Sequence, residues 1–547
     1  MNTKKSLLAA GLVSLALTAP ALAANIILNN VDAPGIGFND TTPAAPVGGN
    51  MGTTVGAQRL IAYQRALELW GKTLRSNATI VVRGSFARLD CARGVLASAG
   101  ALQIFSDFPG ATLTGHWYGS ALANSLAGQD LTPGPLDVPG PDDQSNDDIQ
   151  ANFNGDVGKA DCLPGPGWYY GLDNTPVIPG QIDFLDTFMH EVAHGLGFQN
   201  FVREDNGSMP AGLPDVYMAN TLDLTLGKRW NAMTVPEVKF SAINTGKVVW
   251  AGPRVTSSAP LVLGPYQGVR LFGGVNKEIV YGAASFGAPA SAATLNGSIV
   301  VGLDGAGASS TDACEPLTNA VSGKVVLVDR GNCTFAVKAT NAQAAGASAL
   351  VIANIPTAAD PTAGAFGPGG SAPAVTISVI GISQANGNEV KTALAVPTAV
   401  GIEYFVDPTR LAGATDGLVR LYAPSAVALG SSISHFDTVA SPNLLMEPAI
   451  NGDLRSATNL DLTPALMQDV GWQLETLKIG ACDSGVPATL ATGQLLHVNV
   501  EQCAAGAKNH GQFVSCMTGV TNAAKAKGLL SGAQQGAVMS CAGRGRP

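Results

Sequence analysis

Residues 183 to 200 read DFLDTFMHEVAHGLGFQN, and this stretch decides how the chain is interpreted. Apolar side chains recur at every fourth position from Phe184 to Leu196, a spacing that predicts an amphipathic helix with one buried face. Asp183 comes directly before this pattern and is a favourable N-cap residue. Gly197 follows it and permits a sharp turn. The stretch therefore predicts one short helix with a defined start and end.

Two histidines of this helix, His190 and His194, are four positions apart. Residues at this spacing project from one face of a helix, so both imidazoles can reach a single Zn²⁺ at about 2.0–2.1 Å. Glu191 adjoins the first histidine, where its carboxylate can contact a water on the metal without binding the metal itself. The His-Glu-x-x-His motif therefore predicts a zinc site with Glu191 beside a water on the metal.

A catalytic zinc usually has three protein ligands and one water, and the helix supplies only two. Asn200, the last residue of the stretch, carries a neutral amide and is a weak zinc ligand. Asp215 lies at a spacing comparable to that of the carboxylate ligand in thermolysin-like enzymes. It remains a candidate third ligand.

The other histidines offer a second candidate. His116 precedes the helix, and His497 and His510 belong to the cysteine-containing end of the chain. His435 lies in SISHFDTVASPNLLMEPAI, eleven positions before Met446, which is followed by Glu-Pro. A methionine in a tight turn beneath the zinc is a feature of metzincin proteases.

The combination of His-Glu-x-x-His-x-x-Gly-Phe with a distant His-x₁₀-Met-x-Pro resembles leishmanolysin-type metzincins. The resemblance implies that His190, His194 and His435 bind Zn²⁺, that Glu191 is the general base and that Met446 forms the Met-turn. It is strong over residues 183–201 and 431–450 and diffuse elsewhere. The chain departs from the family in two ways: 241 positions separate His194 from His435, and no long pro-segment with an inhibitory cysteine comes first.

The residues between these two parts have a different character. The segment GKVVLVDRGNCTFAVKATNAQAAGASALVIANI, residues 323–355, reads as strand, turn, helix and strand. It resembles the protease-associated (PA) domain that is inserted in many secreted peptidases, and the resemblance covers about residues 285–400. It implies a Cys314–Cys333 disulfide and a role in binding proteins or restricting access to a substrate, without catalysis.

The expected fold class is α+β: a zincin-like catalytic domain that is interrupted by an α/β PA domain and followed by a small helical unit with cysteines. The insertion is plausible because a domain whose ends lie close together can enter a surface loop at little entropic cost. The expected segments are a signal peptide (1–23), the first catalytic part (24–275), the PA domain (285–400), the second catalytic part (404–475) and the C-terminal unit (476–547).

Composition and the N-terminus indicate an exported protein. Two lysines, a short apolar run and Ala21-Leu22-Ala23 form a bacterial-type signal sequence, and no later apolar run is long enough to anchor the chain in a membrane. The formal charge of −9 disfavours nucleic acid as a partner. All eight cysteines are available for disulfides after export. Cys91 can pair with Cys162 or, as a minor alternative, hold the zinc as an inhibitory thiolate, and the last four cysteines allow three connectivities.

These features predict a secreted zinc endopeptidase that cleaves proteins or peptides. The alternative is a secreted, non-catalytic binding protein with a vestigial zinc site, which the presence of Glu191 disfavours. A serine peptidase with a PA domain is a poor alternative, because the chain has no Gly-x-Ser-x-Gly or Gly-Thr-Ser-Met-Ala stretch.

Overall fold

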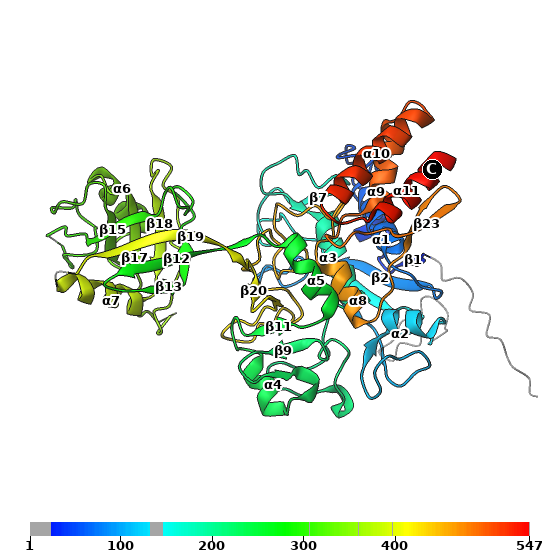
Figure 1. Cartoon of the computed structure of the whole chain (residues 1–547), viewed down its shortest axis with the longest axis horizontal. Coiled ribbons are helices and arrows are strands. Elements are labelled where there is room, and N and C mark those ends of the chain that lie inside the picture. Colours follow the sequence, from blue (N-terminus) through cyan, green and yellow to red (C-terminus); the bar gives the residue numbers. More distant parts are fainter. Residues whose placement is uncertain (1–22, 132–145, 306, 359, 397, 546–547) are drawn as a thin grey trace, which may run out of the picture. The chain divides into compact units, whose positions relative to one another are not determined.

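The computed structural model describes residues 23–131, 146–305, 307–358, 360–396 and 398–545. The chain divides into two compact units (Figure 1). The first unit comprises the residues up to Gly264 together with those from Gly413 onward, and the inserted unit is Pro265–Ala412.

The core of the first unit begins with a four-stranded sheet in the order β1-β2-β6-β3. These strands are β1 (Ile26–Asn30), β2 (Ile80–Ala87), β6 (Ile149–Asn154) and β3 (Ala97–Ala101). The strands β1, β2 and β6 run parallel, whereas β3 pairs antiparallel to β6 and forms one edge of the sheet.

Two helices, α1 (Val55–Thr73) and α3 (Phe184–Leu196), pack against each other and against this sheet. Aromatic side chains fill the contact; for example, the rings of Phe153 on β6 and Phe188 on α3 have centroids 5.3 Å apart. The indole of Trp70 on α1 donates a hydrogen bond to the backbone oxygen of Met189 on α3 at 3.2 Å. The helix that carries the His-Glu-x-x-His motif is therefore fixed on both sides.

A second, five-stranded sheet in the order β10-β9-β11-β21-β20 includes strands from both sides of the insertion. The strands β11 and β21 pair antiparallel, with Val249 opposite Arg420. The remaining elements of this part are η1 (Gly37–Asn39), β4 (Ile104–Phe105), β5 (Tyr118–Gly119), α2 (Ser120–Ala127), β7 (Trp168–Tyr169), β8 (Ile182–Asp183), η2 (Pro210–Gly212), β9 (Thr221–Asp223), β10 (Lys228–Arg229), η3 (Trp230–Ala232), α4 (Val235–Ser241), β11 (Val248–Trp250), α5 (Pro253–Val262), β20 (Ala414–Thr415), β21 (Leu418–Arg420) and α8 (Thr463–Val470).

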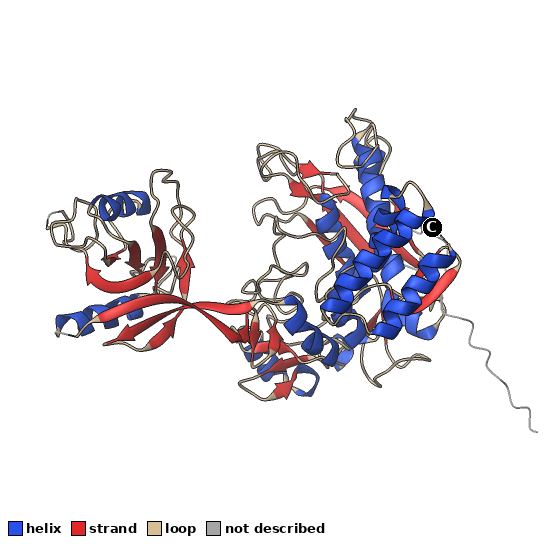
Figure 2. Ribbon diagram, turned by 45° about the horizontal axis from the view of Figure 1, so that its top comes forward, coloured by secondary structure: helices blue, strands red, loops and turns tan. Residues whose placement is uncertain are grey.

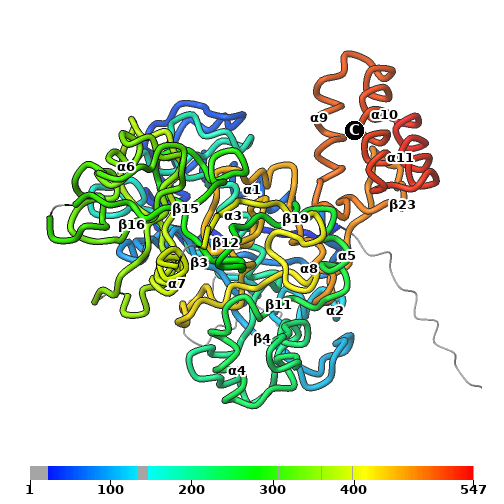
Figure 3. Tube along the Cα trace, turned by 60° about the vertical axis from the view of Figure 1, so that its left-hand side comes forward, coloured from blue at the N-terminus to red at the C-terminus, as the bar shows by residue number. Residues whose placement is uncertain are grey.

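The C-terminal residues of the first unit form a hairpin and three helices that lie together (Figure 3). They are β22 (Thr476–Ile479), β23 (Cys482–Pro487), α9 (Leu496–Gly506), α10 (His510–Ala526) and α11 (Gly532–Arg544). They share an apolar core that includes Leu477, Phe513 and Val538. Of the three connectivities open to their cysteines, the structure contains Cys482–Cys541 and Cys503–Cys516.

The inserted unit is built on an eight-stranded sheet in the order β13-β12-β19-β15-β16-β17-β18-β14 (Figure 2). Its elements are β12 (Pro265–Gly273), β13 (Lys277–Ile279), β14 (Tyr281–Ala283), β15 (Asn296–Val301), β16 (Val325–Asp329), α6 (Phe335–Ala344), β17 (Ala349–Ala353), β18 (Ser378–Ile382), α7 (Gln384–Ala395) and β19 (Val400–Leu411). Alternate residues of β16 enter two different cores, one with Val390 of α7 and the other with Ala339 of α6. The two helices therefore cover opposite faces of the sheet.

The inserted unit is wider than the segment 285–400 expected from the sequence. Strand β12 pairs with β19 from Pro265–Leu411 to Gly273–Val400, so both strands belong to the inserted unit and not to the first unit. The expected catalytic segments 24–275 and 404–475 are shortened accordingly. Residues 1–22 of the predicted signal sequence lie outside the described residues. Among the helices that are described, none is long and apolar enough to cross a membrane.

Candidate metal centre

The helix α3 has the boundaries that its sequence predicts. The Asp183 carboxylate accepts the backbone N–H of Asp186 at 3.0 Å and caps the first turn. At the other end Gly197 has φ 131°, a conformation that side-chain-bearing residues rarely adopt, and the chain turns back so that Phe198 N–H donates to Ala193 O. This turn determines where the chain continues below the second histidine.

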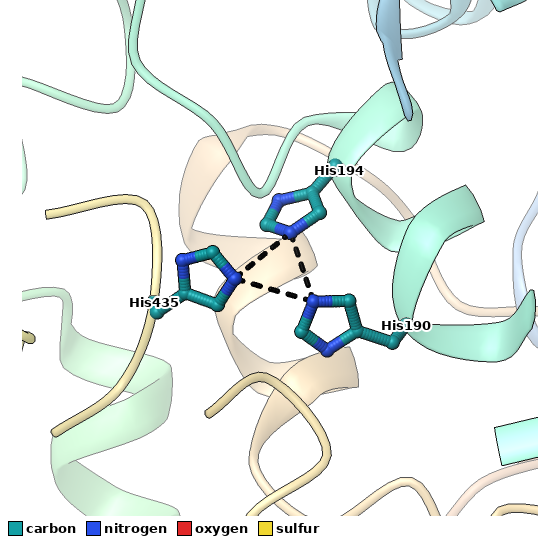
Figure 4. A group of neighbouring side chains, drawn as sticks. All are labelled: His190, His194 and His435. Carbon is teal, nitrogen blue, oxygen red and sulfur yellow. Dashed lines mark hydrogen bonds between the residues drawn. The ribbon is translucent and has the colours of Figure 1, made fainter. Parts of the chain in front are cut away.

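His435 reaches α3 on a separate, irregular segment. Its backbone oxygen accepts the N–H of Tyr422 at 2.9 Å, and the N–H of the following Phe436 donates to Met446 O at 2.8 Å. The segment thus lies between two neighbouring stretches of the same unit, which hold the imidazole at the helix. His190, His194 and His435 come together although the inserted unit separates them in sequence (Figure 4).

The three imidazoles face one another through their Nε2 atoms, which are separated by 3.1, 3.2 and 3.2 Å. Each Nδ1 contacts a backbone oxygen: His190 that of Leu445 at 2.7 Å, His194 that of Phe198 at 2.7 Å and His435 that of Ser431 at 2.8 Å. A carbonyl can only accept, so each Nδ1 carries the proton and each neutral ring has its lone pair on Nε2. Three lone pairs that converge repel one another unless a cation lies between them.

The donor set fits Zn²⁺. Tetrahedral zinc with bonds of about 2.0–2.1 Å requires nitrogen atoms about 3.3–3.4 Å apart, close to the spacing found. Burial is the main cause that lowers the pKa of His190 to about 3 and that of His194 to about 4, and it also lowers the pKa of His435. The rings are therefore neutral at physiological pH, as metal ligation requires. The backbone carbonyls orient the rings in the way that outer-shell groups do in zinc proteins.

Glu191 lies beside these ligands and is buried. Burial raises the pKa of its carboxyl to about 8, and a hydrogen bond from the backbone of Ala99 opposes this shift. Ala99 belongs to the edge strand β3, so the carboxyl group lies between α3 and that strand. Glu191 and the three histidines line one cavity of about 980 Å³.

Met446 is fully buried in a tight turn next to the histidines. The turn is closed by a hydrogen bond from Glu447 N–H to Leu444 O at 3.2 Å and by one from Leu444 N–H to the Glu447 carboxylate at 2.8 Å. Because Leu445 O accepts the Nδ1–H of His190, this turn is connected directly to a candidate ligand.

Asp215, the other candidate for the third ligand, is not part of the histidine group. Its two carboxylate oxygens accept the backbone N–H groups of Phe201 at 2.7 Å and Met218 at 2.8 Å. Burial raises the pKa of this carboxyl to about 7. Asp215 therefore has a structural role in the chain that leaves α3.

Asn200 has a role that the sequence did not predict. Its side-chain amide donates to Ser434 Oγ at 2.9 Å and to Glu204 Oε1 at 3.1 Å, and its backbone N–H donates to the same Ser434 Oγ at 3.1 Å. Ser434 directly precedes His435. Asn200 thus connects the end of the motif to the segment of the third histidine, and only the fold reveals this contact.

The predicted disulfide partners are bonded. Cys314 pairs with Cys333 in the inserted unit, and Cys91 pairs with Cys162 in the first unit. A disulfide sulfur has no thiolate to offer a metal, so the Cys91 alternative does not apply to this state of the protein.

A family model described as the PA domain matches residues 275–390, so the chain contains a PA domain and that prediction is confirmed. Signal peptide peptidase-like 2 of Arabidopsis thaliana is 65% identical over 43 residues, which is 8% of either chain. Signal peptide peptidase-like 5 of the same plant is 28% identical over 170 residues, 31% of this chain and 30% of the relative. The chain therefore spans less than a third of the length of these relatives.

Similar solved structures include a zinc aminopeptidase from Bacillus subtilis, with 24% identity, coverage of 29% of this chain and 37% of that one, and a TM-score of 0.18. Another is a peptidase M28 precursor from Shewanella amazonensis, with 15% identity, coverage of 35% and 45%, and a TM-score of 0.19. TM-scores this low assign neither a fold nor a chemistry to the first unit.

Proposed function

We propose that the protein is a zinc-dependent endopeptidase whose first unit is a metzincin-like catalytic domain. One observation carries the proposal: three buried imidazoles direct their Nε2 lone pairs at one point, beside the buried carboxyl of Glu191, on the wall of a cavity. Three neutral ligands leave the charge of the ion undiminished, as hydrolytic zinc requires.

Bound zinc supplies Lewis acidity, which polarises a peptide carbonyl and makes a water more acidic. Glu191 accepts the proton of the attacking water and then delivers it to the departing amine. The charge of a bound zinc ion favours the ionised form of this carboxyl, which is the form that can accept a proton. A hydrogen bond from the backbone of Ala99 holds the carboxyl beside the edge strand β3.

The edge strand β3 provides a surface for the substrate. Residues Leu96 to Ala99 line the cavity, and β3 pairs with β6 on one side only. An extended peptide can pair with such an edge through its backbone, which gives affinity without selecting a sequence. A peptide bound along a strand can extend past the zinc in both directions, and this favours internal cleavage.

The site of action follows from the N-terminal sequence and the disulfides. A signal sequence at residues 1–23 exports the chain, and the cysteine pairs then form in an oxidising compartment. The PA domain in the inserted unit binds protein or restricts which substrates reach the cavity. Partners are therefore protein or peptide substrates.

The decisive experiment measures zinc content and proteolysis on the same preparation. Purified protein is expected to contain about one zinc per chain and to cleave casein until a chelator removes the metal. Glu191→Gln is expected to keep the zinc and to lose turnover, whereas the exposed Glu68→Gln serves as a control with normal activity. Zinc without cleavage in the unsubstituted protein would instead identify a non-catalytic binding protein.

A second pair of variants tests the third ligand. His435→Ala is expected to lower both zinc content and activity, because it removes one of three converging nitrogen atoms. Asp215→Asn is expected to retain stoichiometric zinc, since its carboxylate is occupied by backbone N–H groups. Undiminished zinc and activity in His435→Ala would show that the third ligand has been misassigned.

A further inference from the structure

The inserted unit contains a second group of residues able to hold a metal ion: Asp304, Asp312 and Glu315. One carboxylate oxygen from each lies within 4.8 Å of the others. The side chains of Asp304 and Asp312 are buried, with 3% and 1% exposure, and Glu315 is half-buried. Like charges this close and this well removed from water repel strongly unless something neutralises them.

Two oxygens of the group are buried without a hydrogen-bond partner. Asp304 uses Oδ2 to accept the N–H of Cys314 at 3.1 Å, but its Oδ1 has no partner. Glu315 Oε2 is in the same situation. A buried carboxylate oxygen that lacks a partner is costly, so each marks a position at which a ligand is expected.

The neighbouring Lys338 does not provide enough charge. Its ammonium is buried, donates to the backbone oxygen of Asp312 at 2.6 Å and lies 3.5 Å from Cys314 Sγ. It interacts electrostatically with all three carboxylates, yet it can offset only one of the three negative charges. Asp312 and Asp304 also interact through a side-chain hydrogen bond, in which one carboxyl must carry a proton. When a cation displaces that proton, a formal excess of two negative charges remains, which matches a divalent cation.

The group is held in place by its surroundings. The Asn332 amide donates to Asp312 Oδ2 at 2.6 Å, and the Cys314–Cys333 disulfide fixes the residue next to Glu315. On another side the backbone passes so close that a Cβ at Gly307 would lie 2.7 Å from both Glu315 carboxylate oxygens. The carboxylates are thus restrained before any ion binds, which lowers the cost of binding.

We propose that Asp304, Asp312 and Glu315 form a Ca²⁺ site in the inserted unit. An all-oxygen, carboxylate-rich site suits a hard cation, and Ca²⁺ accepts the irregular arrangement of ligands that Mg²⁺ tolerates poorly. The unpartnered oxygens of Asp304 and Glu315 are ligands, and Asn332 and Lys338 position and balance Asp312. The site shares no residue with the zinc centre, so it stands independently of the proposed peptidase activity.

The test is calorimetric titration of CaCl₂ into the full-length, zinc-loaded protein after other divalent ions have been removed. One equivalent of Ca²⁺ is expected to bind and to raise the melting temperature, because the ion binds the folded state only. MgCl₂ is expected to bind more weakly. Asp304→Asn is expected to weaken Ca²⁺ binding at least about tenfold, since it removes one ligand charge.

Glu315→Gln is the second variant, for the case that Asp304→Asn does not fold, and the exposed Glu389→Gln in the same unit is the matched control. Absence of Ca²⁺ binding by the unsubstituted protein would overturn the site. The same conclusion would follow if Asp304→Asn and Glu315→Gln bound Ca²⁺ as tightly as the unsubstituted protein. His435→Ala is expected to bind Ca²⁺ normally, so failure of the zinc proposal and failure of this one give different results.

Discussion

Asn200 connects two parts of the candidate metal centre that are distant in sequence. It occupies the position where many zinc-peptidase motifs carry a third histidine, but its amide contacts Ser434, the neighbour of His435. The same residue that leaves the local motif incomplete therefore contacts the segment of the candidate third ligand. We expect it to position His435 and not to bind a metal.

Asn200→Ala removes the side-chain hydrogen bond to Ser434 and leaves the backbone one. Outer-shell losses of this kind typically cost about 10–100-fold in metal affinity. We expect zinc affinity, measured by competition with a chelator, to fall about tenfold, and Ser434→Ala to have a larger effect because it removes both contacts. Asn522→Ala on α10 is the control. Unchanged affinity in both variants would show that Asn200 does not position His435.

Asp148 gives a residue-scale prediction about pH. Burial raises the pKa of its carboxyl to about 7, although Val81 N–H and the Asn124 amide both donate to it. In the unfolded chain this carboxyl has a pKa of about 3.9 and loses its proton near that pH. In the folded state it keeps the proton to a higher pH. Stability from this group is therefore present below about pH 4 and is lost as the pH rises toward 7.

Asp148→Asn removes the pH dependence of stability that comes from this group. Because the asparagine side chain has only one oxygen, it can accept only one of the two hydrogen bonds from Val81 and Asn124 in the same way. Between pH 4.5 and pH 8 the unfolding free energy of the natural protein should fall about 3 kcal/mol more than that of the variant, as an upper value. Thermal unfolding at both pH values checks this, because the stability of the variant relative to the natural protein should increase as the pH rises. If the stabilities of the two proteins changed equally with pH, the raised pKa of Asp148 would be contradicted.

At the scale of elements, the turn at the end of α3 orients one histidine of the candidate metal centre. Gly197 has φ 131°, and the chain it redirects places Phe198 O where it accepts the Nδ1–H of His194. Room is not the constraint, because a Cβ at this position would lie 3.6 Å from its nearest neighbour, an ordinary contact. The backbone conformation alone requires glycine.

Gly197→Ala is therefore expected to destabilise the first unit by about 1–3 kcal/mol, the usual cost of a strained backbone, and to weaken zinc binding. Gly506→Ala is the matched control, since Gly506 ends helix α9 with open space around its Cα and no unusual φ. Unfolding by denaturant and zinc competition measure the two effects. If Gly197→Ala and Gly506→Ala changed stability and zinc affinity equally, the backbone conformation at Gly197 would not be the cause of either effect.

The elements of the site differ in how far sequence could predict them. Helix α3 was predictable because its cap, apolar face and terminating glycine are local signals. The pairing of β12 with β19 joins residues more than a hundred positions apart, and no local pattern specifies it, so the compact inserted unit extends beyond the expected segment 285–400. The contact between Asn200 and Ser434 was missed for the same reason. His435 was identified through a spacing to Met446 and not through any contact, so its role as a ligand stays a prediction.

For the whole molecule, the question is how the first unit tolerates an insertion of this size. Gly264 N–H donates to Ser441 O at 2.7 Å, and a Cβ on Gly413 would lie 2.6 Å from Ala440 Cα. Gly264 and Gly413, which flank the insertion, thus contact two residues that are neighbours in sequence. The Cα atoms of such neighbours are about 3.8 Å apart. Strands β11 and β21, which precede and follow the insertion in sequence, pair with each other. The first unit is continuous in space although it is interrupted in sequence.

Replacing residues 265–412 by a short Gly-Ser linker is therefore expected to leave the first unit folded, with His435 still at α3. A linker of about four residues can span the gap between the two ends. We expect the deletion variant to keep its zinc and its cleavage of short peptides within a few-fold, while its cleavage of folded proteins changes because the PA domain is gone. Loss of zinc from a soluble, monomeric variant would mean that the inserted unit holds the His435 segment in place, and its contribution would then be structural and not one of substrate selection.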